Sequence, residues 1–256
     1  MLNLNQIKKY YPEYLQPFEK HILREYIQYK ILEIVYSSKQ SAKLSFLGGT
    51  ALRLIYNNNR FSEDLDFDNF NLSKKEFIQL TKDVKQGLEK QGFIIEIKQI
   101  FKGAFRCYIK IPEILFMNQI SDLKDEKITI QIDTVPHNFK YLPNKKIINK
   151  FDVFTSILVT PLDIILSQKI YALFNRKRIK GRDIYDILFL WPQASPNYQY
   201  LKEKINIDNK ENLKKKLLAF CEKINLKELT QDLKPFLFKS EDSKRVRMFK
   251  NFIEQI

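Results

Sequence analysis

Two kinds of hydrophobic periodicity divide this chain, and the division limits the folds open to it more than any other feature. Apolar side chains alternate in the manner of β-strands in several runs up to residue 135, whereas after residue 150 they recur mainly at helical spacing. Strand patterns followed by helical patterns are typical of an α+β protein. We therefore expect a mixed β-sheet with flanking helices in residues 1–150 and a helical domain in residues 151–256.

Short local signals mark where individual elements begin and end. Ser73 with Glu76 three residues later forms a capping box, which predicts the start of a helix. The pair 102–103, Lys-Gly, separates two alternating runs and predicts a β-hairpin. Thr160 is expected to cap the next helix, with Pro161 in its first turn. The other expected elements are helices at 15–37, 50–56 and from Asp183, and strands at 43–47, 65–70 and 127–135.

The composition excludes several classes of protein. Hydrophobic residues make up 44% of the 256 residues, which is enough for a sizeable core. The two cysteines and two histidines give neither a disulfide framework nor a structural zinc site. The sequence lacks an apolar run of the ~18 residues that a membrane helix needs, and its N-terminus lacks a signal-peptide core. We expect a cytoplasmic protein with no membrane partner.

The charge balance points to the kind of partner. The chain has 44 Lys and Arg residues against 30 Asp and Glu residues, a net charge of +14. Such a charge favours a polyanionic partner, although a lysine-rich solvated surface has the same composition.

The segment Phe46–Phe67, FLGGTALRLIYNNNRFSEDLDF, carries the residues best suited to chemistry. A strand ends at the glycine pair 48–49, where backbone N–H groups can approach an anion closely, and a helix N-terminus with its positive dipole end follows. Asp64 and Asp66 lie two residues apart on a strand, so both carboxylates project from one face and repel each other unless a cation lies between them. Oxygen ligands of this kind suit Mg²⁺ shared with substrate phosphates.

Further residues supply other parts that phosphoryl-type transfer needs. Arg60 and Ser62 follow the glycine turn and can contact a triphosphate. Asp133, at the end of an alternating run, is a candidate third carboxylate for a two-metal displacement. Each motif alone also has an ordinary explanation: a turn, a solvated acid pair, or a strand-end acid. Their combination in this order indicates phosphoryl-type transfer.

These motifs carry a family resemblance. GGTAL followed by RxSxDxDF resembles the AbiEii-type nucleotidyltransferase toxins of the DNA polymerase beta-like superfamily. Downstream, KxxAxxxR from Lys169 to Arg176 and RDxxD from Arg182 to Asp186 resemble the second signature of that family, so the resemblance covers roughly residues 44–191. It implies a nucleotidyltransferase-like fold and an NTP-dependent enzyme that uses Mg²⁺, with two ions expected.

The resemblance also implies residue roles. A lysine and a downstream aspartate are needed for activity in the family, and these roles fall on Lys169 and Asp186. Whether Asp183 takes the role instead, or only caps its helix and pairs with an arginine, stays open. The implied metal ligands are Asp64, Asp66 and Asp133, and the implied nucleotide contacts are Gly48, Gly49, Thr50, Arg60, Ser62 and Lys169.

Three classes of function remain after this comparison of motifs. The first is a toxin of a toxin–antitoxin or phage-defence system, neutralised by an antitoxin, that adds a nucleotide to RNA, above all the tRNA 3′ end, and so blocks translation. The second is a transferase that modifies a small molecule such as an antibiotic, or a protein. The third is a non-catalytic nucleic-acid-binding protein, which the intact carboxylates disfavour. The residues expected to contact RNA are Arg176, Lys177, Arg178, Lys180 and Arg182.

Overall fold

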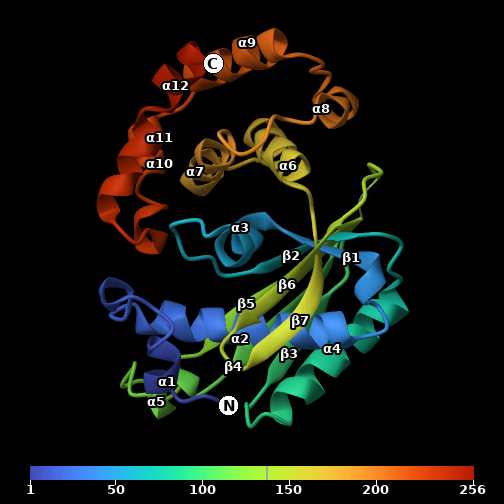
Figure 1. Cartoon of the computed structure of the whole chain (residues 1–256), viewed down its shortest axis with the longest axis vertical. Helices are drawn as coiled ribbons and strands as arrows, with labels where there is room; N and C mark the ends of the chain where they lie inside the picture. Colours follow the sequence, from blue (N-terminus) through green and yellow to red (C-terminus); the bar gives the residue numbers. More distant parts are fainter. Residues whose placement is uncertain (137) are drawn as a thin grey trace. The chain divides into compact units, whose positions relative to one another are not determined.

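The computed structural model describes residues 1–136 and 138–256. His137, for which the sequence indicates a loop, lies outside the described residues. The chain forms two compact units (Figure 1). We call the first the sheet unit and the second the helical unit. The sheet unit comprises Met1–Ile55 and Phe61–Thr160, and the helical unit comprises Tyr56–Arg60 and Pro161–Ile256.

The sheet unit is built on a mixed β-sheet, to which the described residues contribute seven strands in the order β3-β4-β5-β2-β1-β7-β6. Strand β1 runs parallel to β7 and β2 runs parallel to β5, whereas the other neighbours are antiparallel. The expected mixed sheet and the β3–β4 hairpin are therefore confirmed. The strands are β1 Leu44–Leu47, β2 Leu65–Asn69, β3 Glu96–Ile100, β4 Phe105–Ile111, β5 Ile128–Pro136, β6 Asn144–Lys150 and β7 Val153–Val159.

Two long helices, α2 and α4, cover one face of this sheet (Figure 1). The buried rings of Phe46 on β1 and Phe67 on β2 pack against each other on that face, and Tyr36 of α2 reaches Phe67. Because side chains alternate along a strand, Asp66 next to Phe67 belongs to the opposite face. Helices of the sheet unit are α1 Leu4–Lys8, α2 Glu19–Ser37, α3 Gly48–Tyr56, which ends in the helical unit, α4 Lys74–Glu89 and α5 Ile114–Met117.

Two strands, β6 and β7, were not expected from the sequence. They form an antiparallel hairpin whose connection contains Phe151 with a φ of +60°. β7 also pairs with β1, so the hairpin belongs to the sheet unit. The capping box at Ser73 is confirmed, since its hydroxyl and the Glu76 carboxylate bond reciprocally to backbone N–H groups.

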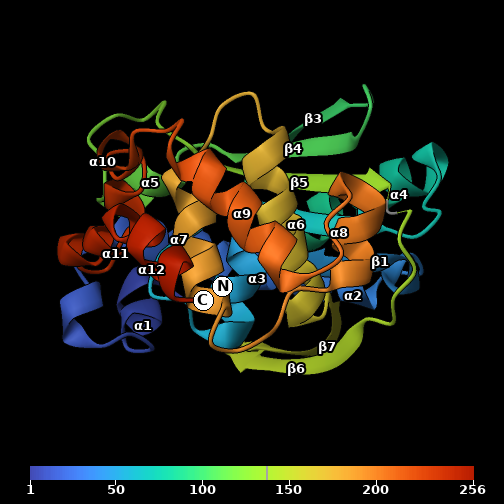
Figure 2. The same ribbon diagram turned by 90° about the horizontal axis from the view of Figure 1, so that it is seen from above.

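The helical unit packs its helices in a small bundle, with α6 against α7 and α8, and α9 against α12 (Figure 2). The expected cap of α6 is wrong by one residue: Pro161 occupies the N-cap, and the Thr160 hydroxyl bonds instead to the Ser45 hydroxyl on β1. None of the helices formed by the described residues is long and apolar enough to cross a membrane. The helices are α6 Leu162–Asn175, α7 Gly181–Leu190, α8 Tyr198–Ile205, α9 Lys210–Cys221, α10 Leu226–Leu229, α11 Lys244–Arg247 and α12 Phe249–Gln255.

Candidate active site

Two neighbouring strands bring Asp66 and Asp133 side by side. β2 and β5 run parallel, and their register pairs Asp66 with Asp133 and Leu65 with Ile132. Leu65 and Ile132 are buried on the helix-covered face, so the two aspartates emerge on the other face. The sheet therefore gathers two acids that lie far apart in the sequence.

Asp64 lies immediately before β2 and is held from two sides. Its carbonyl oxygen accepts a hydrogen bond from the Thr50 hydroxyl of α3, and its Oδ1 accepts one from the backbone N–H of Gln131 at 3.2 Å. Across the residues that the structure describes, no group of three or more His, Cys, Asp or Glu side chains is arranged to hold a metal ion. The three carboxylates are thus anchored to one region of the sheet without forming a closed cage.

Asp133 is held by an arginine that the sequence did not single out. Arg106 on β4 lies opposite Asp133 in the register, and its Nε donates to Asp133 Oδ2 at 2.9 Å. The Gln131 amide donates to the same oxygen at 3.0 Å. The other oxygen, Oδ1, is buried and has no hydrogen-bond partner in the structure. Asp133 therefore has one carboxylate oxygen held by hydrogen bonds from the protein and a second, buried oxygen that accepts none.

The glycine turn is shaped around Asp66. Gly48 has a φ of +79°, and a Cβ at this position would lie 3.0 Å from the Asp66 Cβ and closer still to Asp66 Oδ2. Only glycine fits both the backbone angle and the close carboxylate. Helix α3 begins at Gly48, whereas the sequence indicated a start at Thr50. Thr50 is fully buried, and its hydroxyl fixes the Asp64 backbone.

A network of charged side chains organises the helical unit, and all of its members except Arg176 are largely buried. Arg60 forms a two-point pair with Asp186, with Nε 2.8 Å from Oδ1 and Nη2 2.7 Å from Oδ2. Lys169 Nζ lies 2.9 Å from Asp186 Oδ2 and 3.1 Å from Asp183 Oδ1. Arg176 Nη1 lies 2.6 Å from Asp183 Oδ2. We call these five residues the ionic network.

Electrostatics keeps the buried members Asp186 and Lys169 of the ionic network charged. Burial alone would raise the pKa of Asp186, but the charges of Arg60 and Lys169 outweigh it and hold the pKa at about 2. Burial alone would lower the pKa of Lys169, whereas Asp186 and Asp183 raise it above its ordinary value. Two aspartates are thus matched by three cations.

The structure separates the basic residues expected to contact RNA. Arg176 pairs with Asp183, and the Arg182 guanidinium lies 4.7 Å from the centre of the Phe236 ring. Lys177 and Arg178 are exposed in the connection between α6 and α7. These two are therefore better placed for a polyanion than the other members of the set.

Comparison with known proteins places these features in a family. Residues 30–254 match the family described as Nucleotidyl transferase AbiEii toxin, Type IV TA system. The chain belongs to this AbiEii family. The match extends over most of both units and includes all the candidate residues. No curated protein matches the chain.

Solved structures share the AbiEii chain's fold. JHP933 from Helicobacter pylori is 20% identical, with a TM-score of 0.57, and the match covers 93% of each chain. A candidate nucleotidyltransferase from H. pylori is 21% identical, with a TM-score of 0.58, and the match covers 93% of this chain and 96% of that one. The nucleotidyltransferase-like α+β fold expected from the sequence is therefore confirmed.

Several contacts within the AbiEii chain were not predicted. The segment Tyr56–Arg60 joins the helical unit, where Arg60 forms a β-bridge with Leu237 and the Asn58 amide donates to Asp186 Oδ1 at 3.0 Å. Arg60 and Asp186 were both singled out, but for separate roles. No local pattern relates residues so distant in the sequence.

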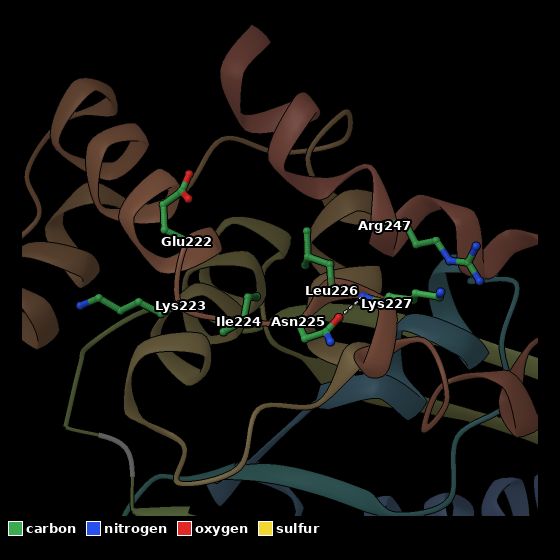
Figure 3. Close-up of a pocket in the computed structure, with 7 residues that line it drawn as sticks. All are labelled: Glu222, Lys223, Ile224, Asn225, Leu226, Lys227 and Arg247. Atoms are coloured by element: carbon green, nitrogen blue, oxygen red, sulfur yellow. Dashed lines mark hydrogen bonds between the residues drawn. The ribbon is translucent and has the colours of Figure 1, made fainter.

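The helical unit also has an open hollow that none of the predicted site residues lines (Figure 3). Lys227 and Arg247 extend toward the same side of it, whereas Lys223 points the other way (Figure 3). The hollow is lined by Glu222, Lys223, Ile224, Asn225, Leu226, Lys227 and Arg247. It is a basic surface distinct from the α6–α7 connection.

Proposed function

We propose that this AbiEii-family chain is a Mg²⁺-dependent nucleotidyltransferase toxin that transfers a nucleotide from an NTP to RNA, with the tRNA 3′ end as acceptor. In this proposal it acts in the cytoplasm, blocks translation and is neutralised by a cognate antitoxin, as part of a toxin–antitoxin or phage-defence system. The observation that carries the proposal is the pairing of Asp66 with Asp133, with the Gly48 turn closed against Asp66.

The chemistry of the three carboxylates suits a divalent cation, although the described side chains do not enclose one. Asp64, Asp66 and Asp133 offer hard carboxylate oxygens from neighbouring positions, and Asp133 Oδ1 is buried without a hydrogen-bond partner. An oxygen of this kind is costly to bury unless a proton donor or a cation completes it. When bound, Mg²⁺ would supply charge stabilisation to the transferring phosphoryl group. The three aspartates are the residues that would hold it, and two ions remain the expected number.

The protein's own groups have distinct roles in this proposal. The backbone of Gly48 and Gly49 at the start of α3 receives phosphate oxygens, because a helix N-terminus presents unpaired N–H groups. Asp133 holds the cation near the attacking hydroxyl through Oδ1, while Arg106 keeps Oδ2 in place. The predicted nucleotide contact Thr50 is fully buried, and we propose that its hydroxyl fixes the Asp64 backbone instead.

Lys169 remains a proposed contact of the triphosphate. An ammonium group carries three donors, and the two aspartates occupy two of them, so one proton remains for a phosphate oxygen. Asp186 and Asp183 would then both act by holding this lysine. The 1% exposure of Arg60 argues against direct contact with the triphosphate. We propose for Arg60 the role of fixing Asp186, and Ser62 remains a candidate nucleotide contact.

The charge distribution supports an RNA acceptor. Residues 161–256 hold 20 Lys and Arg residues against 12 Asp and Glu residues, so +8 of the net +14 lies there. Cationic side chains that contact phosphates release counterions, which makes binding fall steeply with salt.

Replacing Lys177 and Arg178 together by alanine is expected to weaken RNA binding and to leave NTP binding unchanged. Both side chains are exposed, so the change removes charge without opening the core. The slope of log K against log salt should become shallower by about 0.7–0.9 for each phosphate that the variant no longer neutralises. Fluorescence anisotropy with labelled tRNA at several salt concentrations measures this slope.

The matched control replaces Lys223 and Lys227 of the open hollow, which carry the same total charge. A smaller effect of this control pair supports docking at the α6–α7 connection. Equal effects of the two pairs, or binding that does not depend on salt, would argue against that assignment.

Gly48→Ala is expected to displace the Asp66 carboxylate and to lower transfer by about 10²-fold or more, as a misplacement near 1 Å does. Gly92→Ala is the control, because Gly92 also has a positive φ, +90°, but a Cβ there meets nothing within 4 Å. Both variants bear the cost of a positive φ, about 1–2 kcal/mol, but only Gly48→Ala should lose activity beyond its loss of stability. Equal activities at a temperature where both are folded would contradict this role of Gly48.

Incubating the protein with total tRNA and each labelled NTP in turn tests the acceptor. The proposal predicts label that migrates with tRNA and disappears after ribonuclease treatment. Label that migrates with a protein or a small molecule would reject the RNA acceptor.

A further inference from the structure

A glutamine on α2 holds the segment that leads into Asp64. Gln28 is 1% exposed, and its Nε2 donates to the carbonyl oxygens of Ser62 at 3.0 Å and Glu63 at 2.9 Å. One amide nitrogen carries two hydrogens, so a single side chain satisfies two consecutive carbonyls. The peptide groups immediately before Asp64 are thereby fastened to a long buried helix.

Other side chains of α2 contact the same segment. The Arg24 guanidinium lies 3.0 Å from the Glu63 carboxylate. The His21 ring stacks on Phe61, with ring centres 4.8 Å apart and planes 9° apart. The first half of α2 therefore contacts each of residues 61–63. Gln28 contributes two of these contacts, its hydrogen bonds to the carbonyls of Ser62 and Glu63.

We propose that Gln28 is a positioning residue that sets the orientation of the Asp64 carboxylate toward the divalent cation. The proposal rests on the proposed function. Gln28 lies before residue 30, where the family match begins, and outside both sequence motifs. We infer its role from its contacts. Gln28 holds the chain on the N-terminal side of Asp64, and Thr50 and Gln131 hold Asp64 itself.

Loss of the amide should loosen the segment and weaken cation binding. Mutation of a group that orients a metal ligand typically lowers metal affinity by about 10–100-fold. The NTP contacts proposed at Gly48 and Gly49 do not involve Gln28. The effect should therefore appear in the cation requirement and in kcat, with the KM for NTP little changed.

The test compares Gln28→Met with Gln16→Met in the full chain. Methionine keeps the length of the side chain and removes the donors. Gln16 is the matched control, because its amide also donates to a backbone carbonyl of the sheet unit, that of Tyr11 at 3.1 Å, away from residues 61–64. Three quantities are measured: hydrogen–deuterium exchange of residues 60–67, Mn²⁺ affinity by electron paramagnetic resonance, and transfer as a function of Mg²⁺.

Gln28→Met should speed exchange in residues 60–67, weaken Mn²⁺ binding by about tenfold or more and raise the Mg²⁺ needed for half-maximal transfer similarly, with partial rescue at high Mg²⁺. Gln16→Met should change none of these. Two results would overturn the positioning role and leave the proposed function intact. One is faster exchange with unchanged Mn²⁺ affinity, and the other is unchanged exchange. A wild-type protein that transfers no nucleotide would reject the proposed function, whereas exchange and Mn²⁺ binding would still decide the role of Gln28.

Discussion

Asp66→Asn is expected to lower nucleotide transfer on the order of 10³-fold, the scale seen when one preorganised charge-stabilising group is removed from an active site. Asp66 is the carboxylate that the Gly48 turn encloses and that pairs with Asp133 across β2 and β5. Asparagine keeps the shape and removes the negative charge that a cation requires. Stability should be unchanged or increased, because the substitution relieves repulsion between neighbouring carboxylates.

Opposite signs for activity and stability make this prediction specific. Transfer rates and urea unfolding should be measured on the same preparations, with Asp125→Asn as the control for the same chemical change at an exposed loop position. Wild-type activity in Asp66→Asn would remove Asp66 from the site. A loss of activity that follows a loss of stability would mean that the residue serves the fold.

Asp186→Asn is expected to lower the free energy of unfolding by about 3 kcal/mol or more, since breaking a buried ion pair leaves an uncompensated charge. The substitution leaves the buried guanidinium of Arg60 and the ammonium of Lys169 without their shared partner. Glu222→Gln is the control, because Glu222 pairs with Lys250 at the surface, where ion pairs contribute little. Similar urea midpoints for both variants would contradict the structural importance of the ionic network.

Asp186 also makes the free energy of unfolding depend on pH in a known direction. The folded-state pKa of Asp186 is about 2, below its ordinary value of 3.8, so its carboxylate stabilises the fold fully above about pH 4. This contribution, about 2 kcal/mol, is lost as the pH falls through 2. The difference between wild type and Asp186→Asn in the free energy of unfolding should therefore shrink over that interval. Assaying transfer where the variant is folded separates the role of Asp186 in stability from its predicted role in activity.

Local signals in the sequence were enough to find much of the fold and the candidate carboxylates. The capping box at Ser73 and the Lys-Gly pair of the β3–β4 hairpin depend on neighbouring residues only. The β2 strand likewise follows from the alternation of one short run, although it begins at Leu65 and leaves Asp64 just before it. These features need no knowledge of how distant segments meet.

The β6–β7 hairpin escaped prediction for a physical reason. Its connection is Phe151-Asp152, which lacks the Asn-Gly or Asp-Gly chemistry that marks tight hairpins, although Phe151 adopts a positive φ. β6 is an edge strand rich in lysine and mostly exposed, so it lacks a clean apolar alternation. Thr160 resembled a helix cap, but its hydroxyl is used by the sheet.

Side-chain contacts between residues far apart in the sequence could not be predicted from local patterns. Arg106 faces Asp133 because of the β4–β5 register, and Arg60 reaches Asp186 across the core of the helical unit. Gln28 reaches its two carbonyls from a helix in which all nearby positions are buried. Side-chain pairs of this kind depend on tertiary packing, which no short motif encodes.

The most direct measurement of the central claim compares NTP labelled at the α-phosphate with NTP labelled at the γ-phosphate, each incubated with tRNA and Mg²⁺. Nucleotide transfer predicts that the α-label enters the RNA in amounts that fall on the order of 10³-fold in Asp66→Asn, while the γ-label leaves as pyrophosphate. Incorporation of the γ-label would mean phosphate transfer, and the absence of α-label from every acceptor would contradict a nucleotidyltransferase built on Asp64, Asp66 and Asp133.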